Sequence, residues 1–294
     1  MAWISSNLTK SNFRSMLVSP IRSAARRFGL LDAPESHQLS AHWVLSRYAS
    51  MQGKVILEIG GSQSGEAALP FLDDGAASVS ITGLDHITGE ECVNDRLRIL
   101  RANGLSLSSV FEPNSVDVVY GLSIVEHIPS PKIFLNEVHK VLKPGGVAYF
   151  EGNPIWSSPK GHHLWVANWG GLYEHKTTAN YLFNSFPNTK STNPLPDWSH
   201  LLMTSHQMED YLDSASLPRG DIDCIIDWVY LSDQINRLNM REISEAYSTS
   251  KLIVLEANTV RCRVPSNIEL ALRKQHGDGI DFGTRGISYV LLKQ

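Results

Sequence analysis

The sequence of 294 residues is poor in cysteine, in long apolar runs and in net charge. Its 3 cysteines include no CxxC pair, which disfavours a disulfide framework and a cysteine-rich zinc site and fits a reducing, cytoplasmic compartment best. No run of about 18 apolar residues occurs, so we expect no segment that spans a bilayer. The formal net charge of −4 argues against a general nucleic-acid-binding protein.

Acidic residues are also absent from positions 1–31. The basic residues of this segment are Lys10, Arg14, Arg22, Arg26 and Arg27. Because apolar residues are spread among them, the segment is compatible with a basic amphipathic helix that touches an anionic membrane surface. An organelle transit peptide and a helical arm packed on the domain fit the same pattern. All three interpretations stay open.

The composition, 42% hydrophobic and 19% charged, suits one large globular domain or a core with an elaborated insertion. In the first half of the chain, short apolar runs alternate with helical patterns. The predicted strands are 54–59, 78–84, 96–100, 116–120 and 147–150, and the predicted helices are 36–50, 66–72, 90–95 and 131–142. Strands that alternate with helices predict a parallel sheet covered by helices on both faces.

The pattern changes after this half, where prolines and tryptophans become frequent. We interpret the middle of the chain as an insertion that forms a lid, with helices at 205–212 and about 222–237. Regular structure then returns, with helices at 241–250 and 266–275 and strands at 251–258 and 286–293. This divides the chain into an N-terminal arm (1–35), a cofactor-binding core (36–152), the lid (153–240) and the C-terminal part of the core (241–294).

A glycine turn, Gly60 to Gly65, directly follows the first predicted strand. Such a turn presents backbone N–H groups at the carboxyl edge of the sheet, where α/β proteins bind ligands. It is neither a GxGxxG motif nor a phosphate-binding P-loop. Glu58 would repel a pyrophosphate but suits a ligand with an ammonium or sulfonium charge. Asp85, 25 residues after Gly60, can accept hydrogen bonds from ribose hydroxyls or serve as a helix cap or a solvated turn residue.

Four segments, taken in order, resemble the motifs of class I S-adenosylmethionine-dependent methyltransferases of the type 11 group. They are VILEIGG at 55–61, TGLD at 82–85, NSVDVVYGLSIVEH at 114–127 and VHKVLKPGG at 138–146, and GISYVLLK at 286–293 resembles the last strand of the family. The resemblance covers roughly residues 50–152. It implies a Rossmann-like α/β fold: a seven-stranded, mostly parallel sheet with helices on both faces and an antiparallel last strand. It also implies S-adenosyl-L-methionine as the cofactor.

The resemblance further implies how the cofactor is held. The methionine part is assigned to Glu58, Gly60, Gly61, Ser62, Gly65, Gly121, Leu122 and Ser123, and the ribose to Asp85 with His86 beside it. The sequence departs from the family in two places. Ser62 and Ser64 replace later glycines of the turn, so that the turn is one residue longer, and the usual Gly-Asp-Ala beside adenine is missing. Asn103 is the nearest candidate to accept a hydrogen bond from the adenine amino group.

Methyl transfer is an in-line displacement that needs alignment, and a general base where the acceptor is a hydroxyl. His162 and His163 are candidates for this base, as is His127, because histidine titrates near neutrality. The alternatives are that His127 holds its loop and that the histidine pair bonds to the backbone of a lid packed for its own stability. A metal site with Glu174 or His175 has no recognised spacing.

Four further residues are candidates for the acceptor site. Asn153, Trp156 and Trp165 would shape the pocket, since tryptophan faces suit a sugar ring or an aromatic acceptor. Arg237 would meet an anionic group of the acceptor, or serve a structural role.

We therefore expect methyl transfer to a hydroxyl of a saccharide or other small acceptor. The basic segment 1–31 is compatible with a lipid-linked saccharide at a membrane surface as one such acceptor. An N- or C-methyltransferase of a small metabolite, and a cofactor-binding partner protein without transfer activity, remain alternatives. A nicotinamide dehydrogenase is a weaker rival, because its fingerprint glycines are absent. No nucleic-acid partner is expected, and the sequence leaves the oligomeric state open.

Overall fold

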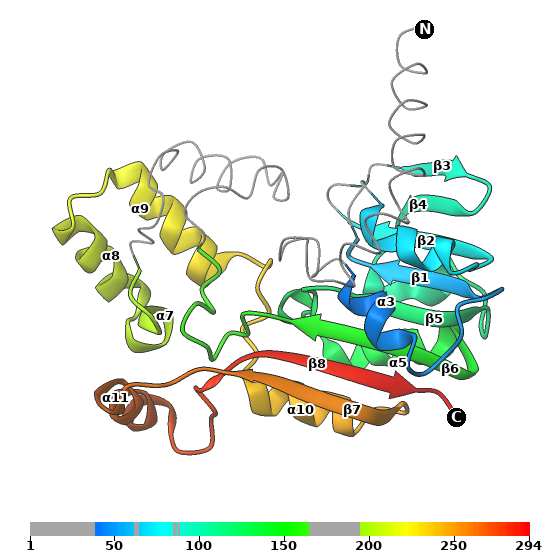
Figure 1. The fold of residues 1–294 in the computed structure, drawn as a ribbon. Helices are drawn as coiled ribbons and strands as arrows, with labels where there is room; N and C mark the ends of the chain where they lie inside the picture. The colour runs from blue at the N-terminus through cyan, green and yellow to red at the C-terminus, as the bar shows by residue number, and fades with distance from the viewer. Residues whose placement is uncertain (1–38, 62–64, 85–86, 88, 165–194) are drawn as a thin grey trace, which may run out of the picture.

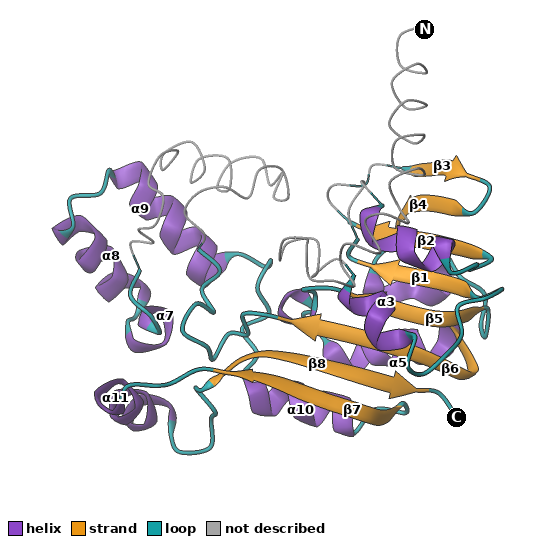
Figure 2. Cartoon of the chain, in the orientation of Figure 1, coloured by secondary structure: helices purple, strands orange, loops and turns teal. Residues whose placement is uncertain are grey.

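A computed structural model describes residues 39–61, 65–84, 87, 89–164 and 195–294. Its centre is one sheet (Figures 1 and 2). The strands are β1 (Val55–Ile59), β2 (Ser78–Gly83), β3 (Glu90–Asn94), β4 (Leu97–Arg101), β5 (Val116–Gly121), β6 (Leu142–Gly152), β7 (Ile253–Arg261) and β8 (Thr284–Leu292). They lie in the order β3-β4-β2-β1-β5-β6-β8-β7. The five central strands from β4 to β6 are parallel, whereas β3, and β8 between β6 and β7, run antiparallel to their neighbours.

Helices cover both faces of the sheet. They are α3 (Ser40–Leu45) and α4 (Leu69–Asp73) on one face, and α5 (Pro131–Val141) and α10 (Met240–Ser248) on the other. Alternate residues of β1 enter opposite cores: Ile56 packs with α3 and α4, whereas Leu57 packs with α5 and α10. Because side chains of a strand alternate between faces, a strand buried on both sides needs a continuous apolar run, which residues 55–57 provide. The predicted fold class is thus confirmed.

The sheet has eight strands rather than the predicted seven, because residues 90–94 form β3 instead of a helix. The Asn94 side chain accepts a hydrogen bond from the Arg96 N–H (2.8 Å). This Asx turn reverses the chain within two residues and pairs β3 with β4 as a hairpin. The apolar periodicity of so short a segment carries no information about such a turn.

A second group of helices lies beyond the carboxyl ends of the parallel strands (Figure 1). It comprises α7 (Ser199–Leu202), α8 (Ser205–Ser214), α9 (Arg219–Ile226), the π-helical turn η4 (Asp227–Leu231) and α11 (Ser266–His276). A capping box between Thr204 and Gln207 starts α8. The helix predicted at 222–237 ends at residue 231, because Ser232 leaves the helix and its hydroxyl accepts the Gln234 N–H (3.1 Å). Within the described ranges, no helix is long and apolar enough to cross a membrane.

Candidate active site

The glycine turn stands at the carboxyl end of β1, as expected. Its first two amide groups, those of Gly60 and Gly61, both donate to the Thr82 carbonyl oxygen at the end of β2 (2.8 and 3.1 Å). Gly60 has a φ of +75°, a conformation that glycine adopts without strain. A Cβ atom on Gly61 would lie 2.5 Å from both the Glu58 carboxyl carbon and an Ile81 methyl group. Packing therefore requires glycine at position 61.

Glu58 lies buried against this turn. Its Oε2 accepts a hydrogen bond from the Tyr120 hydroxyl (2.8 Å), which the parallel register of β1 and β5 brings alongside. Burial raises the pKa of the Glu58 carboxyl to about 7, and the Tyr120 hydrogen bond opposes this rise. The carboxyl is therefore balanced between its neutral and ionised forms near neutral pH. A cation beside it would favour the ionised form.

The end of β5 joins the same edge. A Cβ atom on Gly121 would lie 2.9 Å from the Ile59 carbonyl oxygen and 2.3 Å from the Ile124 side chain, and Ile124 also approaches Gly60. Leu122 and Ser123 follow Gly121 in the turn that leaves β5, and Ser123 has a φ of +51°. Together with Glu58, Gly60 and Gly61, these residues line one edge of the sheet, while Gly65 packs against Ile81 and Leu97 side chains.

Asn103 follows β4 at this edge, where the next residue, Gly104, comes close to Ile59. The Asn103 side-chain oxygen accepts the Leu105 N–H (2.9 Å) and caps the 3-10 helix η2 (Gly104–Ser109). An amide oxygen has a second lone pair, so the assignment of Asn103 as an acceptor for the adenine amino group stays a prediction.

Several predicted residues lie outside the described residues. They are Ser62, Asp85, His86 and Trp165, together with Glu174 and His175 of the alternative metal site and the basic segment 1–31. Their assignments stay predictions. In the part of the chain that the structure describes, no group of three or more histidine, cysteine or acidic residues is arranged to hold a metal ion.

His127 ends the 3-10 helix η3 (Val125–His127), just after β5. It is half-buried, and its Nδ1 bonds to the Gln234 carbonyl oxygen (2.6 Å). Because a carbonyl only accepts hydrogen bonds, Nδ1 carries the proton and Nε2 is the free basic nitrogen of the neutral ring. The ring lies edge-on to His163, with 5.2 Å between the centroids. The structure thus brings together two of the three predicted catalytic histidines.

His162 and His163 are both buried and bonded to the backbone. The His163 Nε2 bonds to the Pro154 carbonyl oxygen (2.7 Å), and burial lowers its pKa to about 3. The His162 Nδ1 accepts the Leu164 N–H (3.0 Å), and burial holds its pKa well below the usual range. Both rings are therefore neutral near pH 7 and are weak bases.

Sequence reasoning missed His200, on α7. It is buried, its Nε2 bonds to the Trp156 carbonyl oxygen (2.7 Å), and burial lowers its pKa to about 4. Its ring lies edge-on to Trp156 at 4.5 Å and to His162 at 5.3 Å between centroids. Nothing local marks this residue, because its neighbours come from a segment more than 35 positions earlier.

Asn153 and Arg237 are both engaged by other groups of the protein. The Asn153 N–H donates to Oε1 of the buried Glu126 (3.1 Å), a second residue whose pKa burial raises. Arg237 donates from Nε and Nη2 to the Val229 carbonyl oxygen (3.2 and 3.1 Å). Its guanidinium group lies 5.6 Å from the centre of the Trp156 ring. Most of the Arg237 donors are thus engaged by backbone groups, as its structural interpretation expects.

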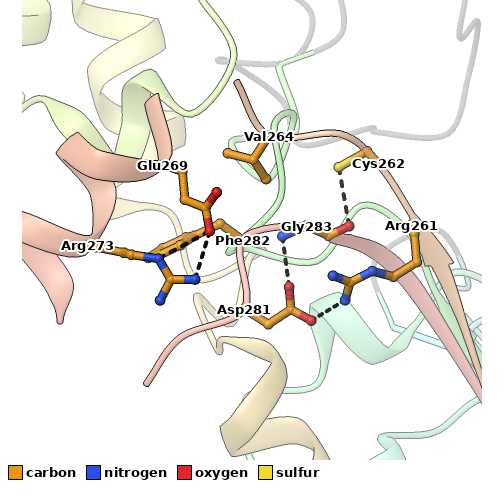
Figure 3. Close-up of a pocket in the computed structure, with 8 residues that line it drawn as sticks. All are labelled: Arg261, Cys262, Val264, Glu269, Arg273, Asp281, Phe282 and Gly283. Atoms are coloured by element: carbon orange, nitrogen blue, oxygen red, sulfur yellow. Dashed lines mark hydrogen bonds and ion pairs between the residues drawn. The ribbon is translucent and has the colours of Figure 1, made fainter. Parts of the chain in front are cut away.

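A separate cavity of about 220 Å³ opens between β7, β8 and α11 (Figure 3). Its charged residues neutralise one another: Arg261 pairs with Asp281, and Arg273 pairs with Glu269 (2.7 Å). Burial raises the pKa of the Cys262 thiol that lines it. Since the thiol is protonated and the charges are paired, this cavity offers neither a nucleophile nor an uncompensated charge.

Residues 57–150 match the family model described as a methyltransferase domain. An uncharacterized methyltransferase of Mycobacterium avium is 30% identical over 142 residues, which cover 47% of this chain and 54% of that relative. One from Mycobacteroides abscessus is 30% identical over 149 residues, covering 48% and 56%. The chain thus spans about half the length of the curated relatives it matches.

Solved structures give weaker likenesses. An S-adenosylmethionine-dependent methyltransferase of Mesorhizobium loti has a TM-score of 0.47 at 16% identity, over 86% of this chain and 96% of that one. A putative one of Listeria monocytogenes has a TM-score of 0.47 at 10% identity, over 88% and 99%. The strand order and the matched motifs, rather than these likenesses, define the fold. Residues 57–150 of this chain thus resemble a methyltransferase domain in sequence, and they lie in a mostly parallel α/β sheet.

Proposed function

We propose that this chain transfers the methyl group of S-adenosylmethionine to a hydroxyl group of a saccharide or another small acceptor. The observation that carries the proposal is the buried Glu58 carboxyl beneath the glycine turn of a methyltransferase domain, with a pKa of about 7. The ammonium group of a bound methionine moiety would favour the ionised carboxylate. A phosphate ligand would instead be repelled by it.

The residues present suit this cofactor. Glu58 is assigned to the cation, the exposed Gly60 leaves room for the ligand at the turn, and Asn103 is assigned to the adenine. Asp85 is assigned to the ribose from its place in the sequence. When bound, the cofactor supplies a methyl group activated by a sulfonium charge. The residues of this chain align the partners and manage the proton of the acceptor.

The acceptor is assigned to the histidine- and tryptophan-rich side of this edge. Burial keeps His163 and His200 neutral near pH 7, so neither adds a positive charge that would oppose a sulfonium nearby. Among the three predicted catalytic histidines, His127 suits the general base best. Its proton is fixed on Nδ1 by Gln234, and it is half-buried, whereas His162 and His163 are fully buried.

Calorimetry with S-adenosylmethionine, S-adenosylhomocysteine and NAD tests the cofactor. We expect both adenosyl ligands to bind and NAD not to bind; binding of NAD alone would overturn the proposal. Release of S-adenosylhomocysteine with panels of saccharides and of amines then tests the acceptor class. Turnover of amines only would show that the hydroxyl assignment is wrong, and binding without turnover of any acceptor would favour a partner protein.

The variant His127→Asn tests the base. Asparagine can still donate to the Gln234 carbonyl oxygen but lacks a basic nitrogen. We expect kcat to fall by about 100-fold or more with unchanged affinity for S-adenosylhomocysteine. His276→Gln is the control, because its Nε2 also bonds to a backbone carbonyl, that of Leu201 (2.7 Å) on α7, rather than to the loop that holds His127. Unchanged turnover in His127→Asn would remove the base assignment.

A further inference from the structure

Buried polar atoms without partners gather where two segments of the chain meet. Seven side-chain nitrogen or oxygen atoms in the described residues are buried and have no hydrogen-bond partner. Five of them belong to Ser157, Ser158, His162, Ser199 and His200, which we call the serine–histidine joint. Buried polar groups are nearly always paired, so a concentration of unpaired ones calls for a partner that the described residues do not supply.

The two segments are in direct contact. The Trp198 N–H donates to the Pro159 carbonyl oxygen (2.9 Å), and the His200 Nε2 bonds to the Trp156 carbonyl oxygen (2.7 Å). The rings of His162 and His200 lie 5.3 Å apart between centroids. The five residues therefore belong to two segments that are in contact, and the two histidine rings among them are neighbours.

Backbone bonds fix the proton on each ring. The Leu164 N–H donates to the His162 Nδ1 (3.0 Å), so the neutral His162 carries its proton on Nε2. His200 donates from Nε2 to a carbonyl oxygen, so its Nδ1 is an acceptor. The two unpaired nitrogens are thus one donor, on His162, and one acceptor, on His200.

One free donor beside one free acceptor limits which chemical groups can bind between the two rings. A carboxylate or phosphate dianion has no proton to give to His200, and an ammonium group has no lone pair to accept one from His162. A metal ion needs an unprotonated nitrogen from each ring, which His162 does not offer. A hydroxyl group both accepts and donates, and the three serine hydroxyls can adapt to it because they rotate.

We propose that the serine–histidine joint is a binding site for a hydroxyl group, held between the His162 Nε2–H and the His200 Nδ1. Two sources supply this group: a hydroxyl of the acceptor that is not methylated, and a bound water. The first source rests on the proposed function and would make the joint a subsite for a polyhydroxylated acceptor. The second does not depend on that function.

Nitrogen NMR of the full chain with ¹⁵N-labelled histidine tests the site without any turnover. We expect His162 and His200 each to be protonated on Nε2, with the His162 N–H and the His200 Nδ1 both showing the shifts of hydrogen-bonded nitrogens. Shifts typical of free nitrogens at both positions, or a proton on the His200 Nδ1, would overturn the proposal. Titration with methyl α-D-glucopyranoside then separates the sources, because only a displaceable guest lets the sugar change these shifts.

Two variants delete the proposed contacts but keep each backbone bond. His162→Asn retains an acceptor for the Leu164 N–H and loses Nε2, whereas His200→Gln retains a donor for the Trp156 carbonyl and loses Nδ1. With any methyl glycoside that is turned over, we expect KM to rise about tenfold, the effect of one lost hydrogen bond. The affinity for S-adenosylhomocysteine should not change. The control His42→Gln, on α3 and bonded to Asp74 away from the joint, should leave KM unchanged.

The outcomes separate the two proposals. A KM that stays constant in both variants, together with hydrogen-bonded nitrogens, assigns the guest to water and removes the acceptor subsite. A third outcome is that no glycoside is turned over, while the two nitrogens are hydrogen-bonded and respond to the sugar. That result would support the hydroxyl-binding site and contradict the proposed methyl transfer to a saccharide. Free nitrogens refute the joint whatever the turnover.

Discussion

Cofactor binding should depend on pH through Glu58, and Tyr120 should set the midpoint of that dependence. Burial raises the Glu58 pKa to about 7, while the Tyr120 hydroxyl, 2.8 Å away, lowers it. If the bound ammonium group requires the carboxylate, the affinity for S-adenosylhomocysteine rises with pH through neutrality and reaches its plateau at about pH 8. With a pKa near 7, only about a tenth of the carboxyl is ionised at pH 6, so affinity there should be about tenfold below its plateau.

The variant Tyr120→Phe removes the hydroxyl that stabilises the carboxylate. A hydrogen bond to a charged group contributes about 1.5–3 kcal/mol, and about 1.4 kcal/mol corresponds to one pKa unit. We therefore expect the midpoint of the affinity curve to move upward by about one unit or more. Calorimetric titration with S-adenosylhomocysteine between about pH 5.5 and pH 9 measures it.

Two variants complete this test. Tyr149→Phe is the matched control, because it removes a tyrosine hydroxyl that donates to another carboxylate, Glu151 (2.8 Å), on β6; the midpoint should not move. Glu58→Gln should bind more weakly and lose the pH dependence in this range. A curve that is identical in Tyr120→Phe and the unsubstituted protein, or a dependence that persists in Glu58→Gln, would refute the reasoning.

Three further predictions concern packing, acid stability and the loop after β5. Gly61→Ala places a Cβ atom 2.5 Å from the Glu58 carboxyl carbon, so we expect a loss of about 1–3 kcal/mol in thermal unfolding and weaker S-adenosylhomocysteine binding by calorimetry. His163 and His200 have folded pKa values of about 3 and about 4, below the ordinary 6.5. Since the unfolded chain then binds more protons, the free energy of unfolding should fall as pH drops below about 6.5, by up to about 1.4 kcal/mol per pH unit for each histidine; denaturant titrations in which His163→Gln keeps the same slope would contradict this. Asn236→Ala removes bonds from its side-chain nitrogen to the carbonyl oxygens of residues 125 and 128 (2.6 and 2.9 Å), and should cost about 1–3 kcal/mol; an unchanged midpoint of unfolding would show that this loop does not depend on it.

The sequence predicted the parts of the fold that depend on local pattern. The apolar runs that became β1, β2 and β5, the helix that begins at Pro131, and the last strand all lie where periodicity and turn residues placed them. The glycine turn and the end of β5 meet because parallel strands share a carboxyl edge. This rule needs no knowledge of side-chain contacts.

What the sequence missed depends on contacts between distant residues. The hydrogen bond from the Arg96 N–H to the Asn94 side chain forms the turn that makes residues 90–94 a strand rather than a helix. Burial, rather than residue type, lowers the pKa of His163 and makes it a weak base. His200 and the serine–histidine joint arise only when α7 packs on residues 156–163. The hydrogen bond between Glu58 and Tyr120 likewise requires the register of two strands 62 positions apart.

A crystal structure of the full chain with S-adenosylhomocysteine is the most direct measurement. We predict that the amino group of the ligand lies within hydrogen-bonding reach of Glu58 or of the turn at Gly60, with its sulfur directed toward the His127 side of the edge. Two results would contradict the proposed role of the Glu58 carboxyl. The ligand could bind elsewhere in the protein, or its adenosine could lie at this edge while its amino-acid part points away from Glu58.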